Sequence, residues 1–417
     1  MLFSSLFAKT AEYEKLAHAL SAPGACALFG LPGSGRAMVY AALAKETGRF
    51  LCIVTPGEAE ATRFAGDLNA LGIPTAVFPA RDYVLRPIEG TAREYEYRRL
   101  SVLGDIVGGR LQAVCVPDEG LTQYTTPRAE FCNNTRTLHP GDTVPRTELT
   151  ALLYNAGYAR RAQVDGPGQF SIRGDIVDLY APDMKLPVRM DSAAAEIDTM
   201  HTFDLATQRR EDPIEKIYVS PAREVLFGSP AEAAELLRAF IIKFRGKKRT
   251  ALEACLATEL AQLDGGALPV NMDKYLAVRY PQPATLLDYF DDPLLVLEEP
   301  ASLREAERAT TYRRGEEISA LLQDGVLAAG LDNLYAENGY LWAQAANHRT
   351  ICAENFARSM PDIPLKDIVN AAAHTLPAWG GEVTSLLEDL QPLCNGGAAV
   401  TVLAGTQRAA AGLAADL

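Results

Sequence analysis

The chain has 417 residues, of which 48% are hydrophobic and 22% are charged, and its formal net charge is −13. This length allows two or three domains of ~100–200 residues each, and without a long low-complexity tract the chain is expected to fold. The acidic balance argues against strong nucleic-acid binding by the chain as a whole, because affinity for the phosphate backbone needs clustered Lys and Arg.

The seven cysteines and five histidines are dispersed. No two cysteines have the Cys-x-x-Cys spacing, so the sequence predicts neither a zinc site nor a redox pair. The N-terminus lacks the pattern of a signal peptide, and no apolar stretch reaches ~18 residues. We therefore expect a cytoplasmic protein without a transmembrane helix or a bound metal.

Strands and helices alternate in the first part of the chain. We predict strands at 25–29, 50–54, 75–78 and 111–116, and helices at 36–47, 58–71 and 93–107. Continuous apolar strands that alternate with helices are typical of a parallel sheet covered on both faces. The sequence thus predicts an α/β fold over residues 1–130.

The pattern changes near residue 131. Short strands at 169–172, 176–180, 187–190 and 197–203, with a helix at 147–155, predict an inserted α+β domain with an antiparallel sheet over 131–227. Apolar residues then recur at helical spacing over about 230–264, which predicts a helical subdomain at 228–285.

The α/β pattern returns over residues 286–417. We predict strands at 294–297 and 398–403 and a helix at 406–417. The last strand and helix either close the first sheet or begin a further domain. Because the chain stops on such a unit, we expect it to be truncated.

A glycine-rich turn follows the first predicted strand. Its sequence is Gly30-Leu-Pro-Gly33-Ser-Gly35-Arg36-Ala37. The spacing matches a P-loop, whose backbone N–H groups cradle phosphates. A working P-loop needs Lys and then Ser or Thr at the last two positions, because the lysine reaches the phosphates and the hydroxyl binds Mg²⁺. Arg36 keeps the positive charge, but on a planar guanidinium instead of a compact ammonium group. The side chain of Ala37 has no oxygen atom that could bind Mg²⁺.

An acidic pair, Glu298-Glu299, follows the predicted strand at 294–297. It occupies the place of a Walker B motif, which begins with Asp in the Asp-Glu form. The longer Glu298 side chain suits the strict octahedral geometry of Mg²⁺ poorly. Together the two motifs favour an NTPase-like fold that has lost catalysis. A turn that is rich in glycine only for its tight geometry, and weak binding of an anion or nucleotide, remain as alternatives.

The predicted insert carries a more specific pattern. Gly157-Tyr-Ala-Arg160-Arg161 is followed by the run from Val164 to Tyr180, which contains Phe170 and Arg173-Gly-Asp, and then by Pro-Val-Arg189-Met. These residues resemble the UvrB-like second domain of the transcription-repair coupling factors (Mfd). The resemblance runs from about residue 20 to the end and is densest over 157–227.

The resemblance implies a UvrB-like arrangement, with a RecA-like first domain, a UvrA-docking insert and a helical subdomain in the ranges given above. Members of this family are ATP-driven translocases that remove stalled RNA polymerase from damaged DNA and recruit the repair protein UvrA. The resemblance further implies that the motor, with its ATP and Mg²⁺, and the RNA-polymerase-binding and DNA-translocating parts lie outside this chain, which itself is expected to need no cofactor. UvrB also has a long aromatic hairpin, but the matching region 79–93 is short, which puts DNA-strand clamping in doubt.

The resemblance also indicates which side chains dock UvrA. The candidates are Arg160, Arg173 and Tyr180, followed by Arg161, Phe170 and Arg189. Arginine and tyrosine are enriched at interface hot spots because they combine contact area with directional donors. In the alternative interpretation, the arginines form ion pairs inside the insert with Asp165, Asp175 or Asp178, and Phe170 belongs to the core.

Three hypotheses follow. The first is a non-catalytic module that recruits UvrA in transcription-coupled nucleotide excision repair. The second is a helicase-like NTPase that uses the Arg36 loop. The third is a DNA-binding module, for which the basic stretch 243–249 is a candidate. We interpret that stretch as a solvated connection between two helices.

Overall fold

The computed structural model describes residues 8–86, 93–193, 195–360, 363–371, 382–398, 400, 402 and 406–416. The chain divides into two compact units, Met1–Ala371 and Ala372–Leu417. Within the described ranges, no helix is long and apolar enough to cross a membrane.

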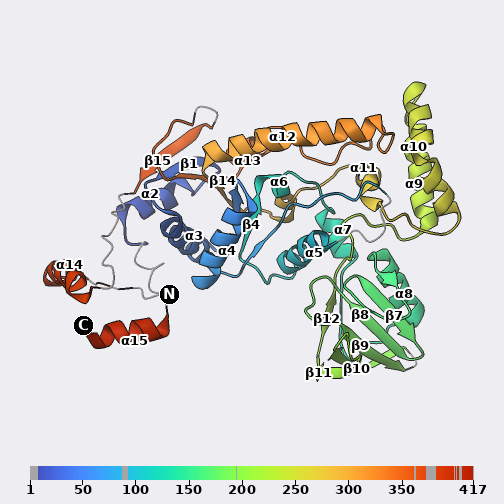
Figure 1. Cartoon of the computed structure of the whole chain (residues 1–417), viewed down its shortest axis with the longest axis horizontal. Helices are drawn as coiled ribbons and strands as arrows, with labels where there is room; N and C mark the ends of the chain where they lie inside the picture. Colours follow the sequence, from blue (N-terminus) through green and yellow to red (C-terminus); the bar gives the residue numbers. More distant parts are fainter. Residues whose placement is uncertain are drawn as a thin grey trace. The chain divides into compact units, whose positions relative to one another are not determined.

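A seven-stranded sheet forms the centre of the first unit (Figure 1). Its strand order is β15-β1-β14-β13-β2-β4-β3, and every neighbouring pair is parallel. The strands are β1 (Gly24–Phe29), β2 (Leu51–Thr55), β3 (Thr75–Val77), β4 (Ala113–Pro117), β13 (Leu294–Glu298), β14 (Arg349–Glu354) and β15 (Leu365–Asn370). The predicted parallel sheet is confirmed. The sequence analysis missed β14 and β15.

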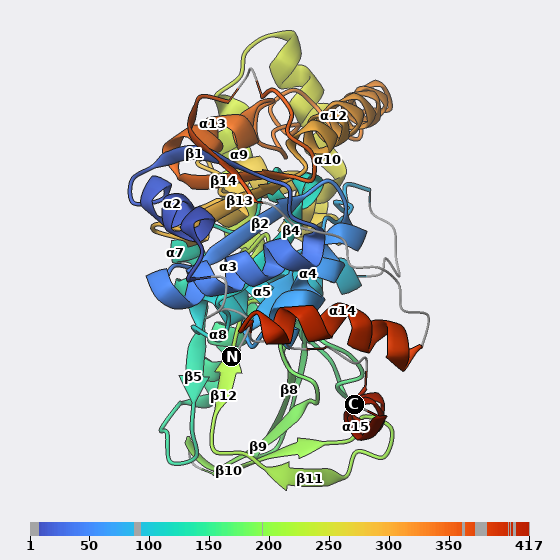
Figure 2. The same cartoon turned by 90° about the vertical axis from the view of Figure 1, so that its left-hand side faces the viewer.

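Helices cover both faces of this sheet, and the strands send alternate side chains to each. On one face, a core is formed by helices α2 (Ala11–Ala19), α3 (Gly33–Thr47) and α4 (Glu58–Ala70). They pack against Ile53 and the other strand side chains that point to the same face of the sheet. Figure 2 shows α3 and α4 lying across the strands. The other core contains Val54 and side chains of α5 (Glu94–Val107), α6 (Asp118–Leu121), α7 (Arg128–Asn133), α12 (Pro300–Gln323) and α13 (Tyr340–Asn347).

A second sheet, of six strands, lies in the predicted insert. Its order is β11-β10-β9-β8-β7-β6, and all pairs are antiparallel except β6 with β7. The strands are β6 (Ala159–Arg160), β7 (Gln169–Arg173), β8 (Ile176–Tyr180), β9 (Val188–Ala193), β10 (Glu196–Phe203) and β11 (Arg210–Pro213). Helix α8 (Arg146–Asn155) packs on one face, where Leu149 and Leu153 join the core. Strands β5 (Arg136–Leu138) and β12 (Ile217–Val219) pair with each other as the chain enters and leaves this region.

The helical section follows as predicted. Helices α9 (Pro230–Ile242) and α10 (Lys247–Asp264) pack against each other, and the basic stretch 243–249 spans their connection. Helix α9 begins where sequence rules expect it, because the Ser229 hydroxyl accepts the amide of Glu232 and Pro230 opens the first turn. Short helices η1 (Met272–Tyr275), α11 (Leu276–Arg279) and η2 (Leu286–Tyr289) lead back to β13.

The second unit contains α14 (Val383–Asn395) and α15 (Gln407–Asp416). Helix α15 confirms the helix predicted at 406–417. The strand predicted at 398–403 falls largely on positions outside the described residues. The predicted domain limits at 130, 227 and 285 stay predictions.

Candidate docking surface and nucleotide cradle

The glycine-rich turn is shorter than the sequence predicted. Strand β1 ends at Phe29 and α3 already begins at Gly33, so only residues 30–32 connect them. The predicted start of this helix at Arg36 was wrong. The amide of Arg36 donates to the Pro32 carbonyl over 2.9 Å, and Gly33 and Gly35 therefore lie in the first helical turn. Pro32 favours this early start because its ring fixes φ near the helical value.

The first glycine of the turn faces protein backbone. Gly30 has φ of +86°, and a Cβ atom there would lie 2.1 Å from the carbonyl oxygen of Ala371. The Ala371 amide in turn donates to the Phe29 carbonyl over 2.9 Å. A close approach of two backbone segments therefore accounts for glycine at this position.

The Arg36 side chain bridges α3 and the end of β13. Its Nη1 atom lies 2.8 Å from Glu298 Oε2 and 2.8 Å from Glu299 Oε1. The Tyr40 hydroxyl donates to Glu298 Oε1 over 2.5 Å. The side chains of Arg36 and Glu298 are only 6% and 2% exposed. Ala37, the position of the missing hydroxyl, is fully buried in the core. We call Arg36, Tyr40, Glu298 and Glu299 the cradle cluster.

Burial dominates the protonation of Glu298. It raises the pKa of this carboxyl to about 7, although Arg36 and the Tyr40 hydrogen bond act in the opposite direction. Within the described ranges, no group of three or more His, Cys, Asp or Glu residues is arranged to hold a metal ion.

In the insert, two predicted docking arginines share one buried carboxylate. Arg173 on β7 donates to Asp178 Oδ2 over 2.6 Å, and Arg189 on β9 donates to Asp178 Oδ1 over 2.6 Å. Asp178 lies on β8 directly opposite Arg189, and its side chain is fully buried. The alternative interpretation of internal ion pairs therefore holds for these two arginines. The Arg173 side chain nevertheless remains 47% exposed.

Arg173 stands at the end of a hairpin. Strand β7 stops at Arg173 and β8 begins at Ile176, so Gly174 and Asp175 form a two-residue turn. Gly174 adopts φ of +59°, which explains glycine there. The bend removes Asp175 from the strand, and its carboxylate pairs with Arg146 of α8 over 3.0 Å.

The other candidates are divided between surface and core. Arg160 and Arg161 lie at the β6 edge of the sheet, both exposed, and neither forms an ion pair with any residue that the structure describes. Tyr180 is partly exposed and its hydroxyl donates to the Lys185 carbonyl over 3.2 Å. Phe170 is fully buried and packs edge-on against Tyr154.

The strand register does not bring all the candidates to one face. Arg160 is paired with Phe170, which points into the core, whereas Arg173 lies three positions further along β7 and hence on the opposite face. The structure thus gathers Arg173, Arg189 and Tyr180 on the outer face of the sheet, and leaves Arg160 and Arg161 at its edge.

Residues 137–225 match the family model of the UvrB interaction domain. The transcription-repair-coupling factor of Bacillus subtilis is 26% identical over 375 residues, which cover 87% of this chain and 32% of that protein. The protein of the same name from Staphylococcus aureus (strain MRSA252) is 23% identical over 391 residues, covering 91% of this chain and 33% of its own length.

The chain resembles the N-terminal region of transcription-repair-coupling factors. It spans about a third of the length of these curated relatives. The six-stranded sheet, with all six predicted docking residues, lies inside the matched segment 137–225, which we call the UvrB interaction domain after that family model.

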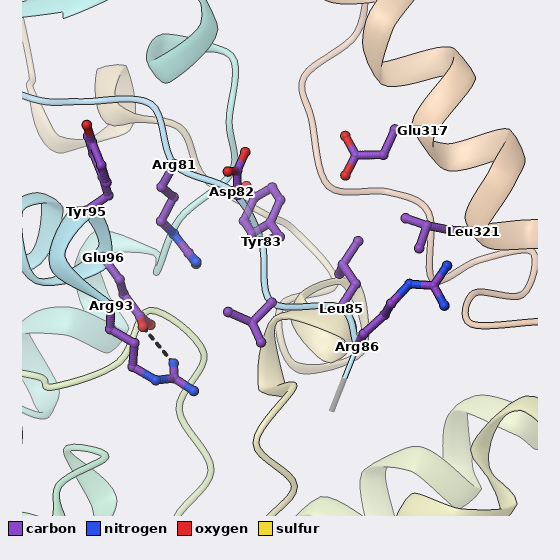
Figure 3. Close-up of a pocket in the computed structure, with 11 residues that line it drawn as sticks. Arg81, Asp82, Tyr83, Leu85, Arg86, Arg93, Tyr95, Glu96, Glu317 and Leu321 are labelled. Atoms are coloured by element: carbon purple, nitrogen blue, oxygen red, sulfur yellow. Dashed lines mark hydrogen bonds and ion pairs between the residues drawn. The ribbon is translucent and has the colours of Figure 1, made fainter. Parts of the chain in front are cut away.

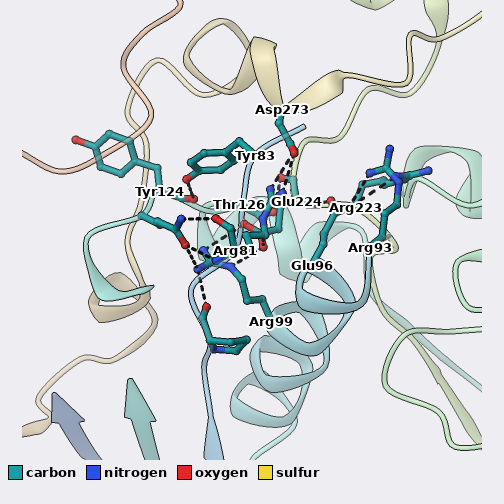
Figure 4. A network of polar contacts seen from close by, with 12 residues as sticks. Arg81, Tyr83, Arg93, Glu96, Arg99, Tyr124, Thr126, Arg223, Glu224 and Asp273 are labelled. Atoms are coloured by element: carbon teal, nitrogen blue, oxygen red, sulfur yellow. Dashed lines mark hydrogen bonds and ion pairs between the residues drawn. The ribbon is translucent and has the colours of Figure 1, made fainter. Parts of the chain in front are cut away.

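A buried polar network ties this domain to its surroundings, and the sequence analysis did not predict it (Figure 4). Arg81 holds Asp273 of η1 with two hydrogen bonds of 2.7 and 3.0 Å and reaches Glu224 over 3.1 Å. Arg99 of α5 donates to the same Glu224 oxygen over 2.7 Å. Glu224 lies in the segment that leaves the UvrB interaction domain. The network therefore joins that domain to the α/β core and to the helical section.

A third carboxyl belongs to the network. Glu96 accepts the amide of Glu224 over 3.0 Å and pairs with Arg93 over 2.8 Å. Burial raises the pKa of Glu96 to about 7, against the influence of Arg81. For Asp273, burial acts to raise the pKa, but Arg81 lowers it overall. The Arg99 side chain is fully buried.

A cavity of about 420 Å³ lies beside this network (Figure 3). Arg81, Tyr83, Arg86 and Glu317 are on its wall. Arg86 and Arg93 both line it, and the six residues between them lie outside the described residues, so the cavity supports no assignment of a ligand.

Proposed function

We propose that this chain is a non-catalytic module that recruits UvrA through the outer face and β6 edge of its UvrB interaction domain. The observation that carries the proposal is the half-exposed Arg173, which pairs with the buried Asp178 carboxylate over 2.6 Å. A pre-positioned arginine loses little side-chain freedom on binding, which favours a role as a hot spot. Arg160 and Arg161 add two exposed guanidinium groups that pair with no carboxylate in the part of the chain that the structure describes.

UvrA binding tests this proposal directly. Immobilised chain is titrated with UvrA, and dissociation constants are compared for wild type, Arg160→Ala and Arg173→Ala. Each substitution is expected to weaken binding about tenfold, which corresponds to ~1.4 kcal/mol. Arg136→Ala is the matched control, because Arg136 is also an exposed arginine in a surface ion pair but lies outside the six-stranded sheet. No binding by the wild type, or equal binding by all variants, contradicts the proposal.

We also infer that the chain does not hydrolyse ATP. Three features support this: Arg36 is paired with Glu298 and Glu299, the Ala371 carbonyl lies against Gly30, and residue 37 has no hydroxyl. A phosphate and its Mg²⁺ would have to displace an internal guanidinium that is 6% exposed. Release of inorganic phosphate by the chain, abolished by Glu299→Gln, would establish the opposite.

In the longer protein that the resemblance implies, this module would bring UvrA to RNA polymerase stalled at DNA damage. The name of the relatives, transcription-repair-coupling factor, fits this role. Translocation and polymerase contact are proposals for the rest of such a protein.

A further inference from the structure

A second cavity, of about 980 Å³, lies where the UvrB interaction domain meets the start of α9 and the loop after α10. We call it the junction pocket. Arg161 at the β6 edge, Arg223 in the segment that leaves the domain, and Arg93 before α5 contribute to its wall. No carboxylate is among the described residues that line it. Three arginine side chains therefore line the pocket, and no acidic side chain among the described residues lines it with them.

The positive charge of this pocket is only partly neutralised. Arg161 has no ion-pair partner among the described residues. Arg223 Nη1 is buried without a hydrogen-bond partner, and it lies 3.8 Å from Glu96 Oε2, an oxygen that already pairs with Arg93 over 2.8 Å (Figure 4). One buried carboxyl thus serves two guanidinium groups. The Arg223 side chain as a whole is 25% exposed and lines the pocket, so an anion there would add the counter-charge that this guanidinium lacks.

The same pocket has an apolar side that solvent reaches. Leu268 and Val270, in the loop after α10, are each 40% exposed, and Tyr154 at the end of α8 is 41% exposed. Apolar side chains that flank a cationic pocket provide contact area beside directional donors, which is the composition of a site for a peptide.

We propose that the junction pocket binds an acidic peptide segment of a partner protein. A glutamate or aspartate carboxylate of the peptide pairs with Arg223 and Arg161, and a neighbouring aliphatic or aromatic side chain covers Leu268 and Val270. Charge favours this occupant over nucleic acid. At a net charge of −13 the chain repels an extended polyanion, whereas a single carboxylate needs only the local arginines. The pocket shares Arg161 with the proposed UvrA-docking edge, but Arg223, Leu268 and Val270 belong to the pocket alone.

Fluorescence anisotropy with synthetic peptides tests the proposal. The probe is a short fluorescein-labelled peptide with one Glu flanked by Leu and Phe residues, and its control has Gln in place of that Glu. Saturable binding of the Glu peptide is expected, with at least tenfold weaker binding of the Gln peptide. Arg223→Gln and Arg161→Gln are each expected to weaken binding of the Glu peptide at least fivefold. Arg249→Gln, at an exposed arginine of α10, should leave it unchanged.

Leu268→Ser provides a further variant at an exposed position, where the fold is expected to be retained, and it should weaken binding of both peptides. Circular dichroism of each variant reports its folding. Equal binding of the Glu and Gln peptides, no binding of either at up to ~1 mM, or stronger binding of oligothymidylate than of the Glu peptide overturns the proposal. Because UvrA is absent from this assay, its outcome is independent of the docking experiment.

Discussion

Replacing Arg36 by Met should destabilise the α/β core, and the cost should depend on pH. At pH 8 the Glu298 carboxyl, with a pKa of about 7, is ionised and paired with Arg36 at 2.8 Å. Removing the arginine leaves a charge in a site where the side chain is only 2% exposed. The carboxyl would take up a proton instead, which at pH 8, one unit above its pKa of about 7, adds about 1.4 kcal/mol to the loss of packing and hydrogen bonding.

At pH 5.5 Glu298 is protonated with or without Arg36. The cost of Arg36→Met should then fall to about 1–2 kcal/mol, the order expected for lost packing and for the hydrogen bond to the Ala353 carbonyl. The raised pKa of Glu298 also means that its protonated form favours the folded state. The stability it contributes is present below the unfolded pKa of ~4.5 and declines as pH rises towards 7.

Urea unfolding followed by circular dichroism measures these costs, and a double-mutant cycle with Glu298→Gln isolates the pair. In the Glu298→Gln background, Arg36→Met should cost about 1–2 kcal/mol at both pH values, because the glutamine is neutral and loses no counter-charge when the arginine is removed. A cost that is the same at pH 5.5 and pH 8, or the same in both backgrounds, would refute the account of the cradle cluster.

Three further predictions concern the UvrB interaction domain and its junction. Glu224→Gln should lower the free energy of unfolding by about 3 kcal/mol in urea titrations, because it leaves Arg81 and Arg99 short of a buried counter-charge; a change below 1 kcal/mol would show that the network is not strongly coupled. Gly174→Ala should cost about 1 kcal/mol in the same titrations, since nothing lies within 4 Å of a Cβ there and only the φ of +59° is strained; a neutral effect would contradict this. Asp178→Asn should weaken UvrA binding about as much as Arg173→Ala in the same binding titration, because it frees the Arg173 side chain; undiminished affinity would argue that the rigidity of Arg173 is irrelevant.

The sequence predicted the parts of the fold that have strong local patterns. The apolar strands β1, β2, β4 and β13 were predicted to within one or two residues of their observed ends, and so was the hairpin of β7 and β8. Strand β14 was missed although it lies in the centre of the sheet, because its apolar run is short and lies between Arg349 and Glu354. Strand β15 pairs on one side only, and the adjacent Lys366 and Asp367 interrupt its apolar residues, which left too short an apolar run to indicate a strand.

The candidate sites were predictable in composition but not in contacts. The altered residues Arg36, Ala37 and Glu298 were evident in the sequence, whereas the pairing of Arg36 with both acidic residues needs the approach of α3 to β13. Likewise, Arg99 is separated by more than a hundred residues from Glu224, and no local pattern indicates that a charged residue on an amphipathic helix will be buried. Such a pairing is set by tertiary structure alone.

Hydrogen–deuterium exchange of the chain with and without UvrA would test the central claim most directly. The account predicts that UvrA slows exchange at the β7–β8 hairpin and the β6 edge, around Arg173 and Arg160, and leaves the cradle cluster unchanged. Protection confined to the α/β core, or no protection anywhere at saturating UvrA, would contradict it.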